Sequence, residues 1–241
     1  GNIWPAQSDY FQAVKSGGHG DYHCLVFAPS SVQEAYDLTV LSFDLADKYR
    51  IPVIILGDGM LGQMMEPVTA EAAEKPQRPQ KKIWAATGCK GREPNVVKSF
   101  YLNMGELEQF NLKLQEKYRD IRHREQRYET FKTDDAEIIL VAYGMMARLA
   151  KKAVESLREK GHKVGLLRPI SLWPYPEDIL KEITGRQPSV RFLVVEMSYG
   201  QMFEDVQLIV NGRAKVDFLG RSGGGVPSEE EIINKVHELL R

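Results

Sequence analysis

The chain has 241 residues, with 32 basic and 33 acidic side chains and a formal net charge of −1. This length allows two domains, and the charge balance gives no reason to expect a nucleic acid or an anionic membrane surface as a partner. No apolar stretch approaches the roughly 20 residues of a membrane-spanning helix. Two cysteines far apart predict neither a disulfide framework nor a metal site, and we expect a cytoplasmic protein with reduced thiols. Because the chain starts at Gly1 without Met, we expect this start to be a cut end.

Residues 1–68 predict part of a parallel-sheet domain. An apolar strand at 23–27 is followed by a helix to about Arg50, which Ser31 and Glu34 open as a capping box. A second buried strand follows at 52–56, and this order of elements makes one right-handed crossover of a parallel sheet. Because a typical sheet has about five strands, we expect these residues to be the second half of a domain.

Residues 69–134 predict an extended connector and a long helix. Pro67, Pro76 and Pro79 prevent regular structure in a stretch rich in Pro, Lys, Gln and Glu. Beyond it, an apolar stripe at helical spacing predicts a helix that lies against the flanking domains or another subunit. The stripe consists of Leu107, Phe110, Leu114, Tyr118, Ile121 and Tyr128.

Residues 135–241 predict a complete four-stranded α/β domain. Strand patterns near 138–142, 164–168, 191–195 and 215–219 alternate with helical patterns near 146–160, 176–184, 202–211 and 228–240. Gly161 and Gly212 end two of these helices, and Pro176 starts another.

The loop Gly57-Asp58-Gly59-Met60-Leu61-Gly62 follows a predicted strand and matches the G-x-G-x-x-G phosphate loop. The helix, the strand and the acidic residue that a dinucleotide site needs do not follow it. The same Gly-Asp-Gly opens the diphosphate and magnesium motif of thiamine diphosphate enzymes, but the next Asn is Asn95, beyond the connector. The sequence therefore favours neither kind of site.

A second glycine-rich loop at 222–228 is interpreted as a turn and a helix cap. Ser228 and Glu231 form a capping box, and the carboxylates of the first turn would repel a phosphate.

The loop Gly18-His19-Gly20-Asp21 places an imidazole near a carboxylate on a flexible loop. These groups could transfer a proton or bind a substrate carboxylate. Alternatively, they could only form hydrogen bonds with backbone groups of the turn. Because open α/β sheets bind ligands at the carboxyl ends of strands, residues 57–66, with Asp58 and Gln63, are further candidates.

The chain has no Gly-x-Ser-x-Gly, Cys-x-x-Cys or His-Glu-x-x-His motif, so we expect no serine hydrolase, iron–sulfur or zinc centre in it.

Over nearly its whole length the chain resembles the alpha-type subunit of the 2-oxoacid:ferredoxin oxidoreductases, most closely the 3-methyl-2-oxobutanoate (2-ketoisovalerate) type. The segments that carry the resemblance are Gly1-Asn2, Pro5-Ala6-Gln7-Ser8-Asp9-Tyr10, Gly18-His19-Gly20-Asp21-Tyr22, Ala28-Pro29-Ser30-Ser31, Asp44-Leu45-Ala46-Asp47, Leu61-Gly62-Gln63-Met64, Leu167-Arg168-Pro169-Ile170, Leu172-Trp173-Pro174, Val195-Glu196-Met197, Gly200-Gln201-Met202, Phe218-Leu219-Gly220-Arg221 and Gly223-Gly224-Gly225-Val226-Pro227.

The resemblance implies an α/β fold in which residues 1–68 are the second half of a thiamine pyrimidine-binding domain. Residues 69–134 then connect to a transketolase-C-terminal-like domain at 135–241, the pyruvate:ferredoxin oxidoreductase domain II. It implies an EC 1.2.7 type reaction, the oxidative decarboxylation of a branched-chain 2-oxoacid to its acyl-coenzyme A with electrons passed to ferredoxin.

The resemblance also implies that thiamine diphosphate and Mg are shared with a beta-type subunit, without which the chain is inactive. Gamma- and delta-type partners would carry the iron–sulfur clusters. The catalytic residues are expected upstream of Gly1, so the site residues named here are only a lining: His19, Asp21, Asp58 and Gln63. Two alternatives stay open: a subunit of another thiamine enzyme of the transketolase type, and a non-catalytic module that bridges subunits.

Overall fold

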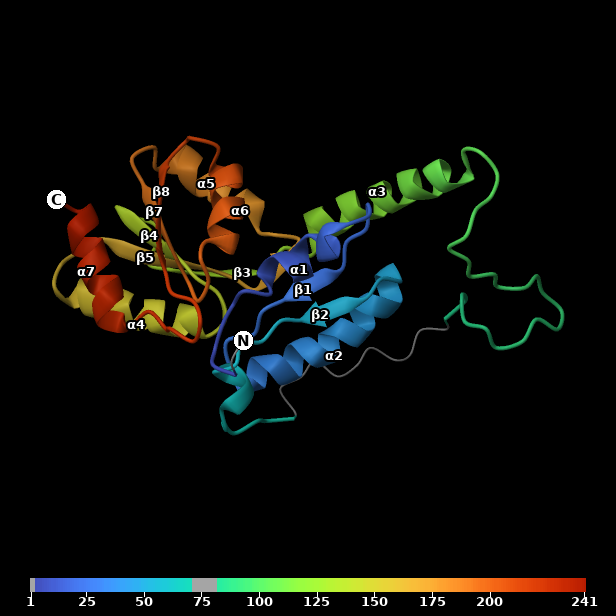
Figure 1. Ribbon diagram of the computed structural model, residues 1–241, viewed down its shortest axis with the longest axis horizontal. Coiled ribbons are helices and arrows are strands. Elements are labelled where there is room, and N and C mark those ends of the chain that lie inside the picture. Colours follow the sequence, from blue (N-terminus) through green and yellow to red (C-terminus); the bar gives the residue numbers. More distant parts are fainter. Residues whose placement is uncertain (1–2, 71–81) are drawn as a thin grey trace.

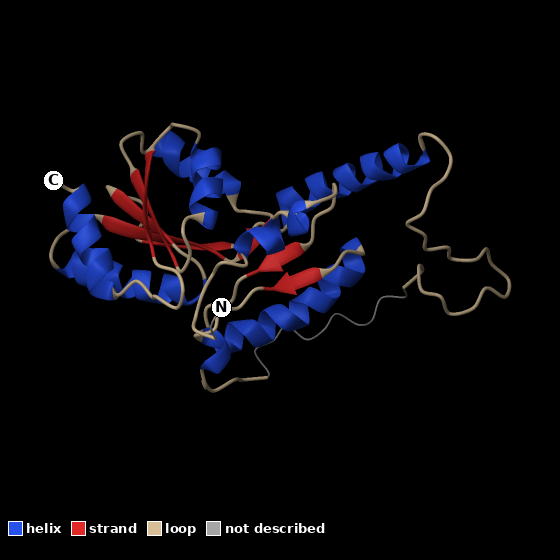
Figure 2. Cartoon of the chain, viewed as in Figure 1, coloured by secondary structure: helices blue, strands red, loops and turns tan. Residues whose placement is uncertain are grey.

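Two sheets, each flanked by helices, form the body of the chain in the computed structural model, which describes residues 3–70 and 82–241 (Figures 1 and 2). The first sheet has the order β2-β1-β6, with β1 at Leu25–Phe27, β2 at Val53–Ile55 and β6 at Ser171–Trp173. Strands β1 and β2 are parallel, with Leu25 opposite Val53, and α2 (Val32–Tyr49) connects them. The predicted strand–helix–strand crossover is confirmed.

The amino-terminal segment adds the short helix α1 (Tyr10–Val14) and the 3₁₀ turn η1 (Ser16–Gly18), and a second 3₁₀ turn, η2 (Leu61–Gln63), follows β2. At the start of α2 only half of the predicted capping box is present. The Ser31 hydroxyl accepts the N–H of Glu34 at 3.1 Å, but the Glu34 carboxylate binds the N–H of Ser30 instead of returning to Ser31. The Glu34 carboxylate does not bind Ser31 because it pairs with Arg168 of the second sheet.

The second sheet has the order β3-β5-β4-β7-β8. Its strands are β3 (Tyr128–Phe131), β4 (Ile138–Val141), β5 (Val164–Pro169), β7 (Arg191–Glu196) and β8 (Lys215–Gly220). All neighbours are parallel except β3 and β5. Helices α4 (Gly144–Glu159) and α7 (Glu229–Leu239) cover one face, while α5 (Glu177–Arg186) and α6 (Gln201–Val210) cover the other (Figure 1). Alternate β4 residues belong to the two cores, so this strand is buried on both sides.

Helix α3 (Glu106–Arg124) is shorter than predicted, because Tyr128 belongs to β3. Placing Tyr128 on the helical stripe was wrong, and so was a count of four strands for the second sheet. The antiparallel edge strand β3 is only half-buried or exposed along its length, so it lacks the apolar run that marks the inner strands. The capping box of Ser228 and Glu231 is confirmed at the start of α7.

The described part of the connector, residues 82–105, contains no helix or strand, while Pro76 and Pro79 lie outside the described residues. Within the described ranges, no helix is long and apolar enough to span a membrane.

Candidate functional site at the domain junction

Asp58 lies in the loop after β2, where the two sheets meet, and its side chain is buried against main-chain donors. One carboxylate oxygen accepts the N–H groups of Met60 at 3.1 Å and Leu61 at 3.0 Å. The other accepts the N–H of Met145, in the first turn of α4, at 3.0 Å. The residue that precedes α4, Tyr143, provides no side-chain cap, so the carboxylate of Asp58 caps this helix from the other domain. We call this group the junction carboxylate.

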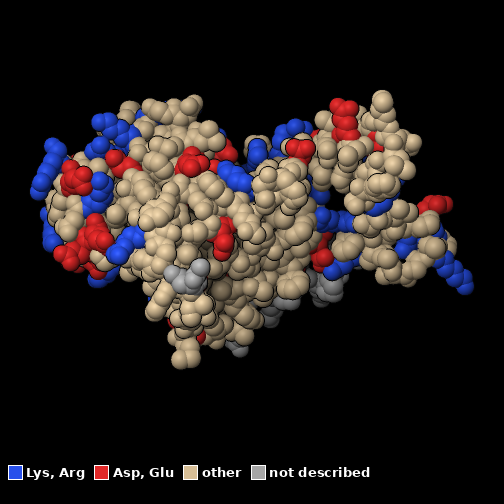
Figure 3. Space-filling model, in the orientation of Figure 1, with Lys and Arg blue, Asp and Glu red and all other residues tan. Residues whose placement is uncertain are grey.

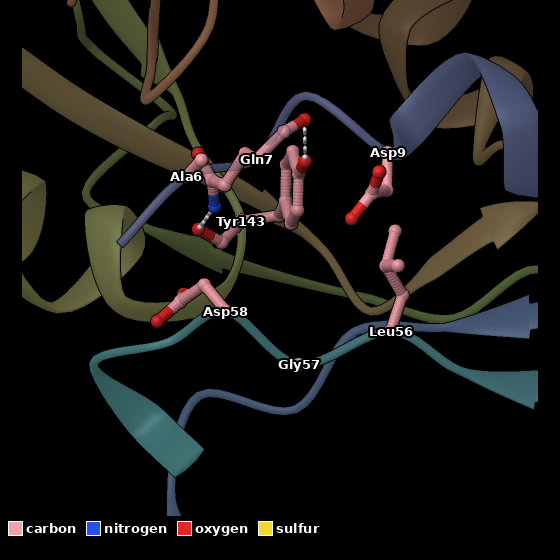
Figure 4. A pocket seen from close by; sticks show the side chains of 7 residues that line it. All are labelled: Ala6, Gln7, Asp9, Leu56, Gly57, Asp58 and Tyr143. Carbon is pink, nitrogen blue, oxygen red and sulfur yellow. Dashed lines mark hydrogen bonds between the residues drawn. The ribbon is translucent and has the colours of Figure 1, made fainter. Parts of the chain in front are cut away.

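Gln7 is the second link between the sheets: both ends of its side-chain amide are hydrogen-bonded, and Figure 4 shows its two hydrogen bonds with Tyr143. Its Nε2 donates to the carbonyl of Tyr143 at 3.0 Å, and its Oε1 accepts the N–H of Met197 at 2.9 Å. Its own N–H donates to the carbonyl of Met197 at 2.9 Å, and the Tyr143 hydroxyl donates to the carbonyl of Gln7 at 3.3 Å. The amino-terminal segment is thereby fixed across the carboxyl ends of β4 and β7.

Gly144 makes this approach possible. Its φ is +56°, and a Cβ at this position would lie 2.8 Å from the junction carboxylate and 3.2 Å from the amide nitrogen of Gln7. Only glycine satisfies both the backbone conformation and the close contact.

A cavity of about 10 Å³ remains at the junction, which is the room of a single water molecule. It is lined by Ala6, Gln7, Asp9, Leu56, Gly57, Asp58 and Tyr143 (Figure 4). The cavity is too small for an organic ligand, so such a ligand would have to bind at the outer edge of the junction.

His19 and Asp21 lie elsewhere, in the loop between η1 and β1, and both are exposed. The Nδ1 of His19 lies 3.4 Å from the carbonyl of Ser16, and the carbonyl of Asp21 accepts a hydrogen bond from Gln115 of α3 at 3.3 Å. Their contacts within this chain are those of a turn held against α3.

The four predicted lining residues fall into two pairs at opposite ends of the first sheet. His19 and Asp21 precede the amino end of β1, whereas Asp58 and Gln63 follow the carboxyl end of β2, and the two strands run parallel. Asp58 and Gln63 share one loop, in which Gln63 is exposed and Asp58 is buried. The lining role of all four stays a prediction.

The residues at this edge do not fit a magnesium-bound diphosphate. The junction carboxylate already uses three of about four acceptor positions on main-chain donors. No group of three or more His, Cys, Asp or Glu that could hold a metal ion occurs within residues 3–70 and 82–241. Gln63 and Met65, an amide and a thioether, are exposed at this edge, and the half-buried carboxylate of Glu66 beside them pairs with Arg148 at 2.8 Å. The amide of Gln63 can both donate and accept hydrogen bonds, as the aminopyrimidine half of thiamine diphosphate requires.

A partly buried ion pair, which sequence reasoning missed, joins α2 to the second sheet on a third side. Arg168 of β5 donates from two guanidinium nitrogens to Glu34, each at 2.7 Å, and also to Ser30 at 2.7 Å and to Glu129 at 3.0 Å. Burial raises the pKa of Glu34, but the hydrogen bonds and charge of Arg168, together with Ser30, outweigh it, so the net pKa is lowered. The bidentate geometry orients α2 against the second sheet.

Glu196 at the end of β7 is a fully buried carboxylate that caps α6. It accepts the hydroxyl of Ser198 at 2.7 Å and the N–H groups of Met202 at 3.2 Å and Phe203 at 3.1 Å. Burial raises its pKa more than these hydrogen bonds lower it. Because Met197 follows it directly, this cap also holds the strand end on which Gln7 rests.

Two protein-family models match the chain, and together they cover residues 1–232. Residues 1–135 match the family described as "Pyruvate flavodoxin/ferredoxin oxidoreductase, thiamine diP-bdg". Residues 136–232 match "Pyruvate:ferredoxin oxidoreductase core domain II". Fold and family models together define an α/β oxidoreductase subunit that has a thiamine diphosphate-binding domain.

Several curated proteins are similar. The chain is 47% identical to the ketoisovalerate oxidoreductase subunit VorB of Methanothermobacter thermautotrophicus, over 99% of this chain and 67% of that protein. It is 34% identical to the 2-oxoglutarate synthase subunit KorA of Methanothermobacter marburgensis, over 96% of this chain and 68% of that protein. The chain belongs to the 2-oxoacid:ferredoxin oxidoreductase family, as the resemblance implied.

A solved structure shows the same fold. It is a 2-oxoglutarate:ferredoxin oxidoreductase from Magnetococcus marinus with 2-oxoglutarate, coenzyme A and succinyl-CoA bound, and it matches with a TM-score of 0.71 at 22% identity. The match covers 99% of this chain and 46% of that chain, so this chain spans less than half of the solved protein. The predicted fold class and enzyme class are confirmed, while the boundaries 1–68, 69–134 and 135–241 stay a prediction.

Proposed function

We propose that the chain acts as the alpha-type subunit of an enzyme that oxidatively decarboxylates a branched-chain 2-oxoacid to its acyl-coenzyme A and passes the electrons to ferredoxin. The observation that carries the choice of substrate is the order of identities. These are 47% to a ketoisovalerate oxidoreductase subunit, 34% to a 2-oxoglutarate synthase subunit and 25% to a pyruvate synthase subunit of Pyrococcus abyssi.

Thiamine diphosphate is the cofactor that the amino-terminal family model implies. When bound, it supplies the electron sink for decarboxylation. In this proposal Gln63 and Met65 of the β2 edge contact its aminopyrimidine. Because the junction carboxylate is committed to main-chain donors, the diphosphate and Mg are assigned to a beta-type subunit. His19 and Asp21, at the opposite end of the sheet, would line the site only if a partner subunit folds over that loop.

The junction has a positioning role in this proposal. Gln7 and the junction carboxylate fix the second sheet to the edge that carries Gln63, while Arg168 fixes α2 from the other side. Catalysis depends on holding groups within a fraction of an ångström. Three separate sets of hydrogen bonds across one interface would keep the loop that carries Gln63 fixed while the partner subunit binds against it.

The proposed partners are a beta-type subunit, gamma- and delta-type subunits with the iron–sulfur clusters, ferredoxin and coenzyme A, in a cytoplasmic complex. The test is anaerobic reconstitution of the subunit that contains this chain with the beta-, gamma- and delta-type subunits, thiamine diphosphate, Mg, coenzyme A, ferredoxin and 2-ketoisovalerate, followed by mass spectrometry of the acyl-coenzyme A product. Isobutyryl-coenzyme A should form with reduction of ferredoxin, and each subunit alone should give none. Carbon-unit transfer without ferredoxin reduction would instead indicate a transketolase-type enzyme.

A further inference from the structure

Two histidine rings meet at the end of the second sheet opposite the junction. His162 lies in the turn between α4 and β5, and His237 lies in the last turn of α7. Their ring centroids are 5.0 Å apart, and the ring planes are inclined by 58°. Both side chains are half-buried, so a dissolved ion can reach them. The pair lies far from the junction, and the proposed reaction does not use it.

Strand direction explains why two helices end at this place. Helices α4 and α7 follow β4 and β8, whose carboxyl ends lie at the junction edge of the sheet, so both helices run back and end at the opposite edge. Arg191, the first residue of β7, donates to the carbonyl of Leu239 at 2.8 Å, which fixes the end of α7 at this edge. Figure 1 shows α4 and α7 next to each other on one face of the sheet.

The packing of α4 against α7 fixes the positions of the two rings. Leu157 of α4 and Val236 of α7 are fully buried in the same apolar core. Ser156 donates its hydroxyl to the carboxylate of Glu229 at 2.8 Å, which is a second link between the helices. The N–H of His162 donates to the carbonyl of Leu157 at 3.1 Å and closes the turn after α4. Both rings are therefore carried by firmly packed elements.

The separation of the rings fits two imidazoles that bind one metal ion. A zinc–nitrogen bond is about 2.0–2.1 Å and the ring centre lies roughly 1.1–1.2 Å behind the nitrogen, so each centroid would be about 3.2 Å from the metal. At a tetrahedral angle of about 109°, the two centroids would be about 5.2 Å apart. The observed 5.0 Å corresponds to an angle of roughly 103° at the metal.

The electrostatics at this edge favour a cation. The last carbonyls of α4 and α7 place the negative ends of two helix macrodipoles beside the rings. Two cations on the same elements are already paired: Lys235 lies 3.0 Å from Glu238, and Arg191 lies 2.7 Å from Asp217. Figure 3 shows basic and acidic side chains interspersed at this end of the molecule, so basic charge does not dominate the face drawn.

We propose that His162 and His237 form a binding site for one divalent transition-metal cation, such as Zn²⁺, that links the ends of α4 and α7. Neutral imidazole is a ligand that suits Zn²⁺, Ni²⁺ and Cu²⁺. The pair supplies two ligands and water fills the other positions, which agrees with the absence of a group of three or more metal-ligating side chains within the part of the chain that the structure describes. The expectation of no zinc centre rested on local sequence motifs, which two histidines from separate elements do not form. The ion has a structural role, and the proposal does not depend on the proposed reaction.

The test is a calorimetric titration with ZnCl₂ of the full subunit that contains this chain, after treatment with EDTA. His162→Gln and His237→Gln should each weaken the Kd of the same single Zn²⁺ at least about tenfold, because changing a group that only supports a ligand already costs about 10–100-fold. The double variant should lose that one Zn²⁺ and no other. His123→Gln, an exposed change in the last turn of α3, is the matched control and should leave the Kd unchanged.

Hydrogen exchange gives a second, independent readout. The amide of Leu240 donates to the carbonyl of Val236 at 3.1 Å and reports on the end of α7. With Zn²⁺ at about ten times its Kd or more, exchange of this amide should slow about tenfold in the wild type and stay unchanged in either variant. Equal Zn²⁺ binding by the wild type and both variants would show that the pair is only a ring contact and would overturn the proposal. The same weakening in His123→Gln, or unchanged exchange with Zn²⁺ bound, would also overturn it.

Discussion

The substitution Asp58→Asn tests whether the junction carboxylate is a structural cap. Asparagine keeps the shape and one acceptor oxygen, but its NH₂ group must face either the N–H of Met145 or those of Met60 and Leu61. At least one hydrogen bond to a charged acceptor is lost and one main-chain donor stays buried without a partner, and the favourable charge at the start of α4 disappears. The expected loss of unfolding free energy is about 2–4 kcal/mol.

The assay is thermal and urea unfolding of the chain, with hydrogen exchange followed at the amides of Met145 and Leu61. The loss should lower Tm by roughly 5–15 °C, and protection should fall first at the amide that faces the new NH₂ group. The matched control is Asp134→Asn, an exposed change that should cost no more than about 0.5 kcal/mol. The interpretation of Asp58 as a structural cap would be refuted by an Asp58→Asn variant that is as stable as this control but whose assembled enzyme no longer binds metal or thiamine diphosphate.

Three further changes probe the same interface, each measured by thermal unfolding. Gly144→Ala should cost about 2–3 kcal/mol, because it combines positive φ with a clash on the junction carboxylate. Gly212→Ala, with φ +75° and open space, should cost only about 1 kcal/mol, and equal losses would show that the contact is irrelevant. Gln7→Glu turns a donor into an acceptor that faces a carbonyl and should cost about 2–3 kcal/mol; an unchanged Tm would contradict the observed hydrogen bonds. Glu34→Gln should cost about 2–3 kcal/mol at pH 7 by leaving Arg168 underpaired.

The Glu34→Gln variant also predicts a change in pH dependence. The folded pKa of Glu34 is lowered, so its stabilisation is present above the unfolded pKa of about 4.3 and is lost as the pH falls through the lowered folded value. The variant should therefore lose less stability than the wild type on acidification below about pH 5. Parallel Tm curves for the two proteins over this range would contradict the assignment.

Sequence patterns were sufficient where local signals decide the structure. The crossover from β1 through α2 to β2 and the inner strands of the second sheet carry continuous apolar runs and helix caps, and both were found. Strands β3 and β6 were missed because their pairing is decided by distant residues: Tyr128 pairs with Pro169, and Trp173 with Val26 in the other sheet. A short strand with no apolar alternation gives no signal of its own.

The candidate site was predictable only in part for the same reason. The loop at 57–62 was set apart from a dinucleotide site because the helix, strand and acidic residue of such a site do not follow it in the sequence, and this stays a prediction. The use of Asp58 as a cap for α4 depends on a contact 87 residues away, and the contacts of Gln7 reach 136 and 190 residues along the chain. Strands β1 and β2 run parallel, so a loop before β1 and a loop after β2 lie at opposite ends of the sheet. Strand direction alone would therefore have separated His19 and Asp21 from Asp58 and Gln63.

The most direct test of the central claim is the substrate preference of the reconstituted enzyme, measured as kcat/KM for ferredoxin reduction with coenzyme A present. The account predicts turnover that requires this chain, its beta-type partner and thiamine diphosphate, with 2-ketoisovalerate preferred over 2-oxoglutarate and pyruvate by at least about tenfold. A preference for 2-oxoglutarate or pyruvate would contradict the substrate assignment. Full activity without this chain would contradict its role as a catalytic subunit.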